Sequence, residues 1–385
     1  MTTHATTKLG ATGPAVFPLA LGCMGTSGMY GATDDAESVA AIQAAIDAGV
    51  TLIDTGDFYG MGHNELLVRE GIKGRRERVN VSVKFGALRS PSGAWLGFDG
   101  RPSAVKSFAS YSLKRLGVEV IDIYRPARLD PNVPIEDTIG AIKDLIKEGY
   151  VRHIGLSEVG ASTIERAARV HPIADLQIEY SLASRGAEAK IFPQLEALGI
   201  GATLYGVMSR GLLTGSTPQG KSDFRAYLPR FTGDNRTQND HVVDTLKAFA
   251  EARGMTTGQL TVAWVLAKKP GFVTRSARSK SRSHPMMSLR SKSSCRPMRS
   301  LARATAPSRW RTWTASALEL AAVVDAHPAV GAGVVRADVL YPIKICSGGQ
   351  QRIVLIELDH RAVDVAQRDL GRVELKHVIH AAVDE

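Results

Sequence analysis

Residues 51–60 read TLIDTGDFYG. The first four residues form a short apolar run that ends in the carboxylate of Asp54, and the last six form a glycine-punctuated loop that carries Tyr59. A buried parallel strand that runs into a functional loop has this pattern. On these residues alone, a plain turn with Tyr59 packed at its rim explains the pattern equally well, so the choice depends on the rest of the chain.

Short apolar runs alternate with amphipathic segments along most of the chain. The runs that predict strands are residues 19–22, 51–54, 79–84, 120–124, 151–157, 175–178 and 200–205, with the start of an eighth at 271–273. The segments that predict helices are residues 33–48, 64–73, 103–116, 135–148, 161–170, 187–198, 238–253 and 257–268. Strands that alternate with helices at this spacing form a parallel sheet.

Eight such units close into a (β/α)₈ TIM barrel, which is the α/β fold that we predict, preceded by a β-hairpin at residues 8–18. A doubly wound open sheet is the alternative. It would use the glycines of residues 22–28 to bind a dinucleotide, but these glycines lack the spacing of the dinucleotide fingerprint. The barrel is therefore the stronger prediction.

The composition indicates a globular protein in a reducing compartment. The chain has 385 residues, of which 44% are apolar, which is enough for a large core. Its three cysteines are too few for a disulfide framework and lack metal-binding spacing, so we predict no metal site and a cytoplasmic location. No apolar signal segment and no long apolar run is present, so we expect no membrane partner.

The formal charge of +10 comes from one segment. Residues 274–311 contain eleven Lys and Arg, ten Ser and no Asp or Glu. The remaining 37 basic residues balance 38 acidic ones, so the rest of the protein is close to neutral. A nucleic-acid-binding arm is one interpretation of this segment. Because Arg and Ser without interleaved aromatic residues give salt-sensitive, non-specific contacts, we predict no specific nucleic-acid partner.

Polar side chains recur where the expected strands end. The residues at these positions are Asp54, Lys84, Tyr124, Ser157, Gln177 and Tyr205. In a barrel, the C-terminal strand ends carry the chemistry. A free tyrosine, with a pKa of about 10, is a poor proton donor at neutral pH, and a lysine held nearby by an aspartate lowers this pKa. Asp54, Tyr59 and Lys84 are therefore the candidate catalytic set, although a solvated lysine at a strand end is the plainer alternative for Lys84.

These motifs together resemble those of the aldo-keto reductase family. The resemblance covers roughly residues 8–273 and is carried by DTGDFYG (54–60), Lys84, IGLSE (154–158), QIEYS (177–181) and YGVMSRGLLTG (205–215). It implies an enzyme that reduces aldehydes or ketones at the mouth of a (β/α)₈ barrel with a nicotinamide cofactor, usually NADPH. The partner would be a small-molecule carbonyl substrate, which the sequence does not single out, and the oligomeric state stays open.

The resemblance also implies roles in proton transfer. Tyr59 would be the general acid, with Asp54 and Lys84 as the groups that tune it. The family usually places a histidine just after the fourth strand to orient the substrate carbonyl, and Ala127 holds that position here. The neighbouring Arg128 is the first candidate for a replacement donor, but a surface ion pair is the expected use of this side chain.

A third set of roles concerns the cofactor. By the resemblance, Ser157 and Gln177 would hydrogen-bond its carboxamide group, and Tyr205 would stack on its nicotinamide ring. A core aromatic residue at a strand end is the alternative for Tyr205. The other residues that would line the cofactor site are Gly22, Cys23 and Met24, together with Asp54, and those that would wrap the pyrophosphate are Ser209, Arg210, Gly211 and Leu212.

A second departure from the family follows residue 273, because residues 274–283 read TRSARSKSRS instead of a turn and a helix. We therefore expect a barrel domain at 1–273 that is incomplete at its eighth unit and has an open edge. A disordered basic segment at 274–311 and an unassigned tail at 312–385 would follow. A shifted reading frame or a fusion in the coding DNA would explain such a break. The turn that binds the 2′-phosphate of NADPH in the family would then be lost, and only Arg275 or Arg278 could contact this phosphate. The alternative function is a catalytically weak nicotinamide-nucleotide-binding protein on the same barrel.

Overall fold

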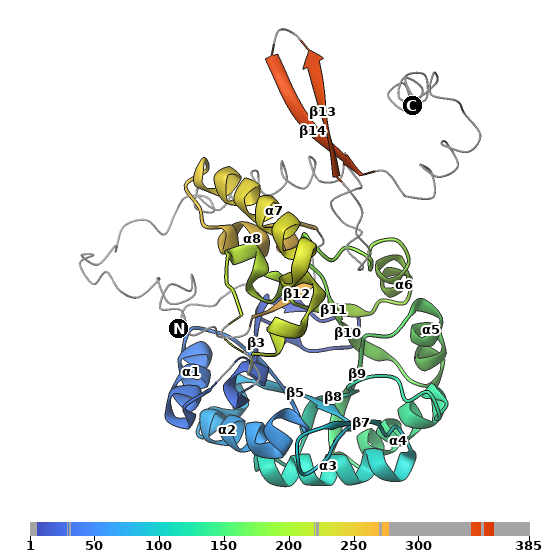
Figure 1. The fold of residues 1–385 in the computed structure, drawn as a ribbon. Helices are drawn as coiled ribbons and strands as arrows, with labels where there is room; N and C mark the ends of the chain where they lie inside the picture. The colour runs from blue at the N-terminus through green and yellow to red at the C-terminus, as the bar shows by residue number, and fades with distance from the viewer. Residues whose placement is uncertain are drawn as a thin grey trace, which may run out of the picture.

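A closed barrel of eight parallel strands forms the body of the protein (Figure 1). The computed structural model describes residues 6–28, 30, 32–218, 220, 223–268, 272–276, 340–347 and 350–357. The strands follow one another around the barrel in chain order: β3 (Leu19–Gly22), β4 (Leu52–Gly56), β5 (Asn80–Phe85), β8 (Ile121–Pro126), β9 (Val151–Ser157), β10 (Ile173–Glu179), β11 (Gly201–Tyr205) and β12 (Phe272–Ser276). The predicted (β/α)₈ fold is confirmed.

Helices connect successive strands and cover the outside of the barrel (Figure 1). They are α1 (Asp35–Asp47), α2 (His63–Ile72), α3 (Pro102–Leu116), α4 (Ile135–Lys147), α5 (Ala161–Val170), α6 (Ile191–Ala197), α7 (Gly233–Glu251) and α8 (Thr257–Lys268). Local chemistry fixes their ends: the Asp34 carboxylate accepts from the backbone N–H of Glu37 at the start of α1, and Gly117 ends α3 at φ 64°. In the described part of the chain, no helix is long and apolar enough to cross a membrane.

The eighth strand closes the barrel, contrary to the expectation of an open edge. β12 pairs in parallel with β11 on one side, where Ala202 lies opposite Phe272, and with β3 on the other, where Leu21 lies opposite Ser276. The strand therefore continues three residues beyond Val273. The polar side chains of Thr274 and Arg275 do not prevent this, because strand pairing uses backbone groups that every residue other than proline supplies. Residues 274–276, which were expected to be disordered, thus belong to a strand. Residues 277–311 and most of the expected tail lie outside the described residues.

The described part of the chain also contains three antiparallel hairpins. The first, β1 (Thr7–Lys8) and β2 (Ala15–Val16), confirms the predicted N-terminal hairpin. The second, β6 (Ala87–Arg89) and β7 (Trp95–Phe98), lies in the loop after β5 and was not predicted. The third, β13 (Leu340–Ser347) and β14 (Gln350–Glu357), lies in the unassigned tail.

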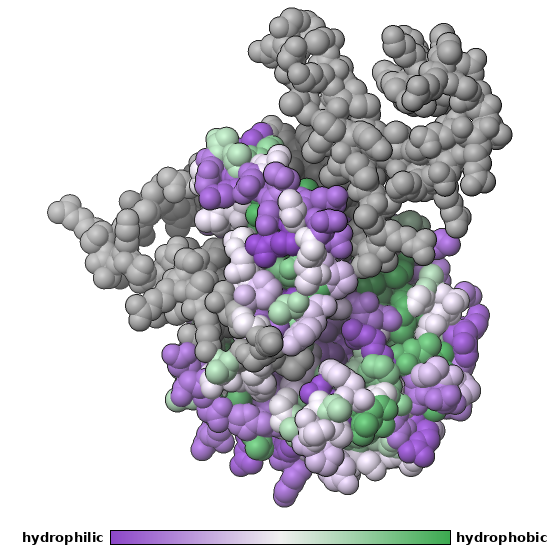
Figure 2. All heavy atoms as spheres, in the orientation of Figure 1, coloured by the Kyte–Doolittle hydropathy of each residue, from purple (hydrophilic) through white to green (hydrophobic). Residues whose placement is uncertain are grey.

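Buried apolar side chains form three separate clusters in the described part of the chain, and the cluster around the 3₁₀ helix η4 (Ser209–Thr214) contains Leu212, Phe231 and Val243. The largest cluster packs the helices against the outer face of the barrel, and the exposed face of α7 is mainly hydrophilic (Figure 2). A smaller cluster joins the N-terminal hairpin to the starts of four strands through Leu9, Val16, Ala20, Leu52, Ile123 and Val273. The interior nearer the C-terminal strand ends holds buried charged and polar residues instead, and this region contains the candidate site.

Candidate active site

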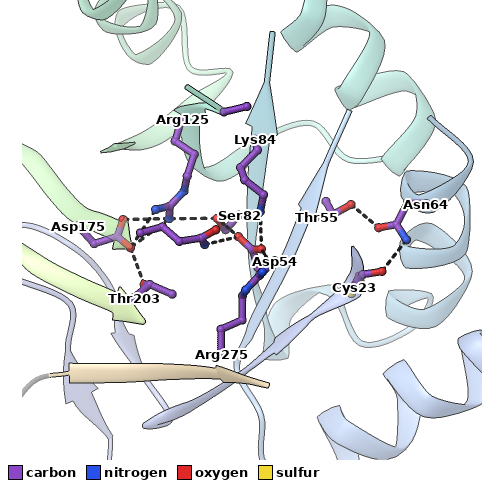
Figure 3. A network of polar contacts seen from close by, with 12 residues as sticks. Cys23, Asp54, Thr55, Asn64, Ser82, Lys84, Arg125, Asp175, Thr203 and Arg275 are labelled. Atoms are coloured by element: carbon purple, nitrogen blue, oxygen red, sulfur yellow. Dashed lines mark hydrogen bonds and ion pairs between the residues drawn. The ribbon is translucent and has the colours of Figure 1, made fainter. Parts of the chain in front are cut away.

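Asp54 lies at the centre of a buried polar cluster in the mouth of the barrel (Figure 3). β4 and β5 are hydrogen-bonded neighbours that place Asp54 beside Ser82 and Gly56 beside Lys84. The ammonium group of Lys84, whose side chain is only 4% exposed, forms an ion pair with Asp54 Oδ1. Asp54 Oδ2 accepts hydrogen bonds from Ser82 Oγ at 3.1 Å and from Gln177 Nε2 at 2.8 Å. The fold thus brings together three residues that the sequence placed at strand ends.

Burial and the neighbouring charges have opposite effects on Asp54. Burial raises the pKa of its carboxyl group, but the cations of Lys84, Arg275 and Arg125 together hold this pKa well below its usual range. For Lys84, burial lowers the pKa to about 7, although the attraction of Asp54 opposes this effect. Asp54 is therefore ionised at neutral pH, whereas Lys84 titrates close to neutrality.

Tyr59 lies directly after β4, on the 3₁₀ turn η2 (Tyr59–Gly62), and is 4% exposed. Lys84 Nζ lies 5.1 Å from the centroid of its ring. Burial raises the pKa of Tyr59 to about 12, and the nearby cation of Arg275 only partly offsets this increase. The pKa of Tyr59 therefore lies above its usual value, because the cost of desolvating the phenolate exceeds the attraction of the cations. The tuning of this phenol by Lys84 stays a prediction.

A second buried ion pair supports Asp54 from inside the barrel (Figure 3). Arg125 on β8 is fully buried and pairs with Asp175 on β10 at 2.9 Å. Arg125 Nη2 also donates to Ser82 Oγ at 3.1 Å, and Asp175 accepts a hydrogen bond from the hydroxyl of Thr203 on β11. This chain of contacts holds Ser82 in place to donate to Asp54. This ion pair was not predicted from the sequence. The available signal was the charge of Arg125 and of Asp175, each beside the apolar residues of its strand.

The loop after β3 is tied to the site by Asn64. Gly22, the last residue of β3, lies beside Asp54, and the 3₁₀ helix η1 (Cys23–Ser27) follows it. Asn64 Nδ2 donates to the backbone oxygen of Cys23 at 2.8 Å, while its Oδ1 accepts from Thr55 Oγ1 at 2.6 Å. Burial raises the pKa of the Cys23 thiol to about 12, so this thiol is protonated at neutral pH. Asn64 therefore holds this segment against β4.

The residues predicted to contact the nicotinamide lie at or near the C-terminal ends of neighbouring strands. Ser157 lies beside Gln177 on β9 and β10, and Tyr205 lies beside Glu179 on β11 and β10. Burial raises the pKa of Tyr205 well above its usual value, and the negative charge of Glu158 raises it further. Among the predicted cofactor residues, the buried ones are Gly22, Cys23, Asp54, Ser157, Gln177, Ser209 and Leu212, and the half-buried ones are Met24, Tyr205, Arg210 and Gly211.

The turn η4 (Ser209–Thr214) contains the four residues predicted to surround the pyrophosphate. Ser209 and Arg210 have φ values of 49° and 59°, a left-handed conformation that is unfavourable for residues other than glycine. Arg230, which was not predicted, donates to Ser209 Oγ at 2.7 Å and to Glu179 Oε1 at 2.8 Å. Arg210 donates to the other oxygen of Glu179 at 3.3 Å. These contacts fix the strained turn at the end of β11.

Ala127, which stands where the family usually has a histidine, is buried in the structure. Ala127, directly after β8, is 2% exposed, and its backbone N–H donates to Phe85 O at 2.8 Å. Arg128 donates to the backbone oxygen of Ala127 at 2.7 Å. Burial raises the pKa values of Tyr59 and Tyr205, and the positive charge of Arg128 acts in the opposite direction on both. Arg128 is therefore close enough to influence both phenols.

Arg275 has a place in the site that the sequence did not predict. Its guanidinium group pairs with Asp54 Oδ1, and its side chain is 8% exposed. We had considered this arginine only as a contact for the 2′-phosphate of the cofactor. The structure instead directs it into the barrel mouth (Figure 3), and Arg278 lies outside the described residues. No sequence signal gave this direction, because it depends on strand β12 reaching Ser276.

Known proteins share this barrel. A model of the aldo/keto reductase family matches residues 18–294, so the chain belongs to this family, and the match extends past the predicted boundary at 273. A glycerol dehydrogenase from Gluconobacter oxydans is 28% identical and superimposes with a TM-score of 0.65 over 71% of this chain and 86% of that chain. An aldo-keto reductase from Bacillus halodurans is 23% identical, with a TM-score of 0.63 over 82% of this chain and 96% of that chain.

A third solved structure shows the fold again. It is a thermostable aldo-keto reductase in complex with the inhibitor epalrestat, 24% identical, with a TM-score of 0.58 over 81% of this chain and 100% of that chain. Membership of the family makes the chain an oxidoreductase that acts on small-molecule carbonyl compounds with a nicotinamide cofactor.

Proposed function

We propose that the protein reduces aldehydes or ketones to alcohols with NADPH and that Tyr59 is the general acid. One observation carries the proposal: Asp54, Lys84 and Tyr59 are buried together at the C-terminal ends of β4 and β5, where barrel enzymes carry their chemistry. A buried phenol beside a cation is suited to donate a proton to a carbonyl oxygen as negative charge develops there.

The residues around this set suit a nicotinamide nucleotide. The cofactor supplies a hydride to the carbonyl carbon. Gln177 presents its amide at the end of β10, and Tyr205 presents an aromatic ring at the end of β11. The backbone of η4 and the Gly22–Met24 segment would line the remainder of the cofactor. In this proposal Asp54 anchors Lys84, Lys84 supplies positive charge beside Tyr59, and Tyr59 holds the transferable proton at its Oη atom.

A second candidate function is a nucleotide-binding protein with weak catalysis. The observation that favours it is Ala127, which leaves the expected histidine position without a side-chain donor. An oriented donor at such a position contributes about 3 to 4 kcal/mol of transition-state stabilisation in other enzymes. The two candidates share the cofactor site and differ in turnover.

The experiment combines a binding titration with a turnover assay. NADPH and NADH are titrated by cofactor fluorescence, and a panel of aldehydes and ketones is tested with each. In the proposed function, Tyr59→Phe abolishes carbonyl reduction and does not weaken NADPH binding, because only the hydroxyl is removed. Equal turnover in wild type and Tyr59→Phe would exclude Tyr59 as the acid. Nucleotide binding without turnover in the wild type would favour the second candidate.

A further inference from the structure

Arg275 contacts several parts of the proposed nicotinamide site at once. Its side chain leaves the end of β12 and passes Gly22 so closely that a methyl group on that glycine would lie 3.0 Å from the Cγ, Cδ and Nε atoms of the arginine. The guanidinium group then pairs with Asp54 and hydrogen-bonds to Tyr59. Its carbon atom lies 5.5 Å from the centroid of the Tyr205 ring. One side chain thus spans the space between β3, β4 and β11.

The same residues are those that the proposed function assigns to the cofactor and the reacting carbonyl. A guanidinium group is planar and stacks on aromatic rings, as a nicotinamide ring does. A nicotinamide ring placed between Gly22 and the ring of Tyr205 would overlap the Arg275 side chain, which already lies against both. The surrounding residues therefore fit the nicotinamide only when the Arg275 side chain has left this position.

We propose that Arg275 is an internal competitor for the nicotinamide end of the cofactor and that it determines how tightly the protein binds nicotinamide nucleotides. This inference rests on the proposed function. Binding requires the guanidinium group to leave Asp54, while Lys84 continues to pair with the same oxygen atom. Asp54 is therefore not left as an unpaired buried charge, which would make the exchange prohibitive.

The size of the effect follows from the population of the open arrangement. Apparent affinity is the intrinsic affinity reduced by the fraction of molecules in which the pocket is free, so a pocket open in one molecule in ten weakens binding about tenfold. Because Arg275 is buried and makes three polar or stacking contacts, we expect Arg275→Ala to bind NADPH and NADH at least about tenfold more tightly than wild type.

The test measures binding and does not depend on turnover. NADPH and NADH are titrated by fluorescence and by calorimetry into wild type, Arg275→Ala and Arg275→Met. The exposed Arg69→Ala serves as a matched control for the loss of one arginine. Arg275→Met keeps the length of the side chain but removes its ion pair, so we expect an affinity between those of wild type and Arg275→Ala. If Arg275→Ala does not fold, Arg275→Met decides the question by binding more tightly than wild type or not.

Guanidinium chloride gives a second readout. At low millimolar concentration it should refill the pocket of Arg275→Ala and weaken NADPH binding there, with no such effect on wild type, and sodium chloride at equal ionic strength is the control. Equal or weaker nucleotide binding by the Arg275 variants, without competition by guanidinium, would overturn the inference and leave the proposed function intact. An absence of nucleotide binding in wild type and in every variant would instead overturn the proposed function, and the inference with it.

Discussion

Replacing Lys84 by methionine removes a buried ammonium group whose protonation the fold makes unfavourable. Methionine has a similar length and no charge, so the packing of β5 is largely kept. Arg275, Ser82 and Gln177 still contact Asp54 in the variant. The change therefore isolates the contribution of the Lys84 charge to stability and to catalysis.

The sign of the stability effect follows from the pKa of Lys84. Burial lowers this pKa from 10.5 to about 7 in the folded protein. Between these two pH values the unfolded chain binds one proton more than the folded protein, so wild-type stability rises with pH. One pKa unit is worth about 1.4 kcal/mol, so the full shift corresponds to at most about 5 kcal/mol, of which about 3 kcal/mol falls between pH 7 and pH 10. Lys84→Met lacks this increase.

The assay is urea unfolding of wild type, Lys84→Met and the exposed Lys106→Met at pH 7, 8, 9 and 10. We expect the free energy of unfolding of wild type, relative to Lys84→Met, to grow by about 3 kcal/mol over this range. The Lys106→Met curve should stay parallel to wild type, because this lysine is 42% exposed and its burial cost is small. Carbonyl reduction by Lys84→Met should fall by about 100-fold and its pH profile should move. Parallel unfolding curves for wild type and Lys84→Met would refute the reasoning.

Three further predictions concern neighbouring features. Ala127→His should raise turnover by about tenfold or more if its ring reaches the substrate carbonyl, and unchanged turnover in an active enzyme would point to Arg128 as the donor. Burial raises the pKa of Asp57 to about 7, so Asp57 stabilises the fold below its ordinary pKa of 3.8 and loses this contribution as pH rises through 7. Asp57→Asn should therefore unfold at a higher temperature than wild type at pH 8 and show no such gain at pH 4, whereas a gain independent of pH would contradict the cause. We also propose that a break in the coding frame follows β12, so that the chain beyond Ser276 is not a native continuation of the barrel. Translation of the other frames downstream of that codon should give a turn and an amphipathic helix, and limited proteolysis should cut first between 277 and 311. A protease-resistant tail with no such frame would contradict this proposal.

The sequence alone determined the barrel and its reactive end. Alternating strand and helix patterns are local, because they depend on residue spacing along one element, and eight of them specify a closed parallel sheet. The same argument placed Asp54, Lys84, Ser157, Gln177 and Tyr205 at strand ends, and the structure places each of them within two residues of the C-terminal end of its strand.

The tertiary structure decided how these side chains are charged and what lies between them. The raised pKa of Tyr59 and the lowered pKa of Lys84 depend on burial, which the spacing of residues does not give. The ion pair of Arg125 with Asp175 joins β8 to β10 through two residues that are 50 positions apart in the sequence. Arg275 lies in the barrel mouth only because β12 pairs with both β11 and β3 and so directs its side chain at Asp54, 221 residues earlier in the chain. Contacts between residues this distant in sequence arise from closure of the sheet, and no local pattern contains them.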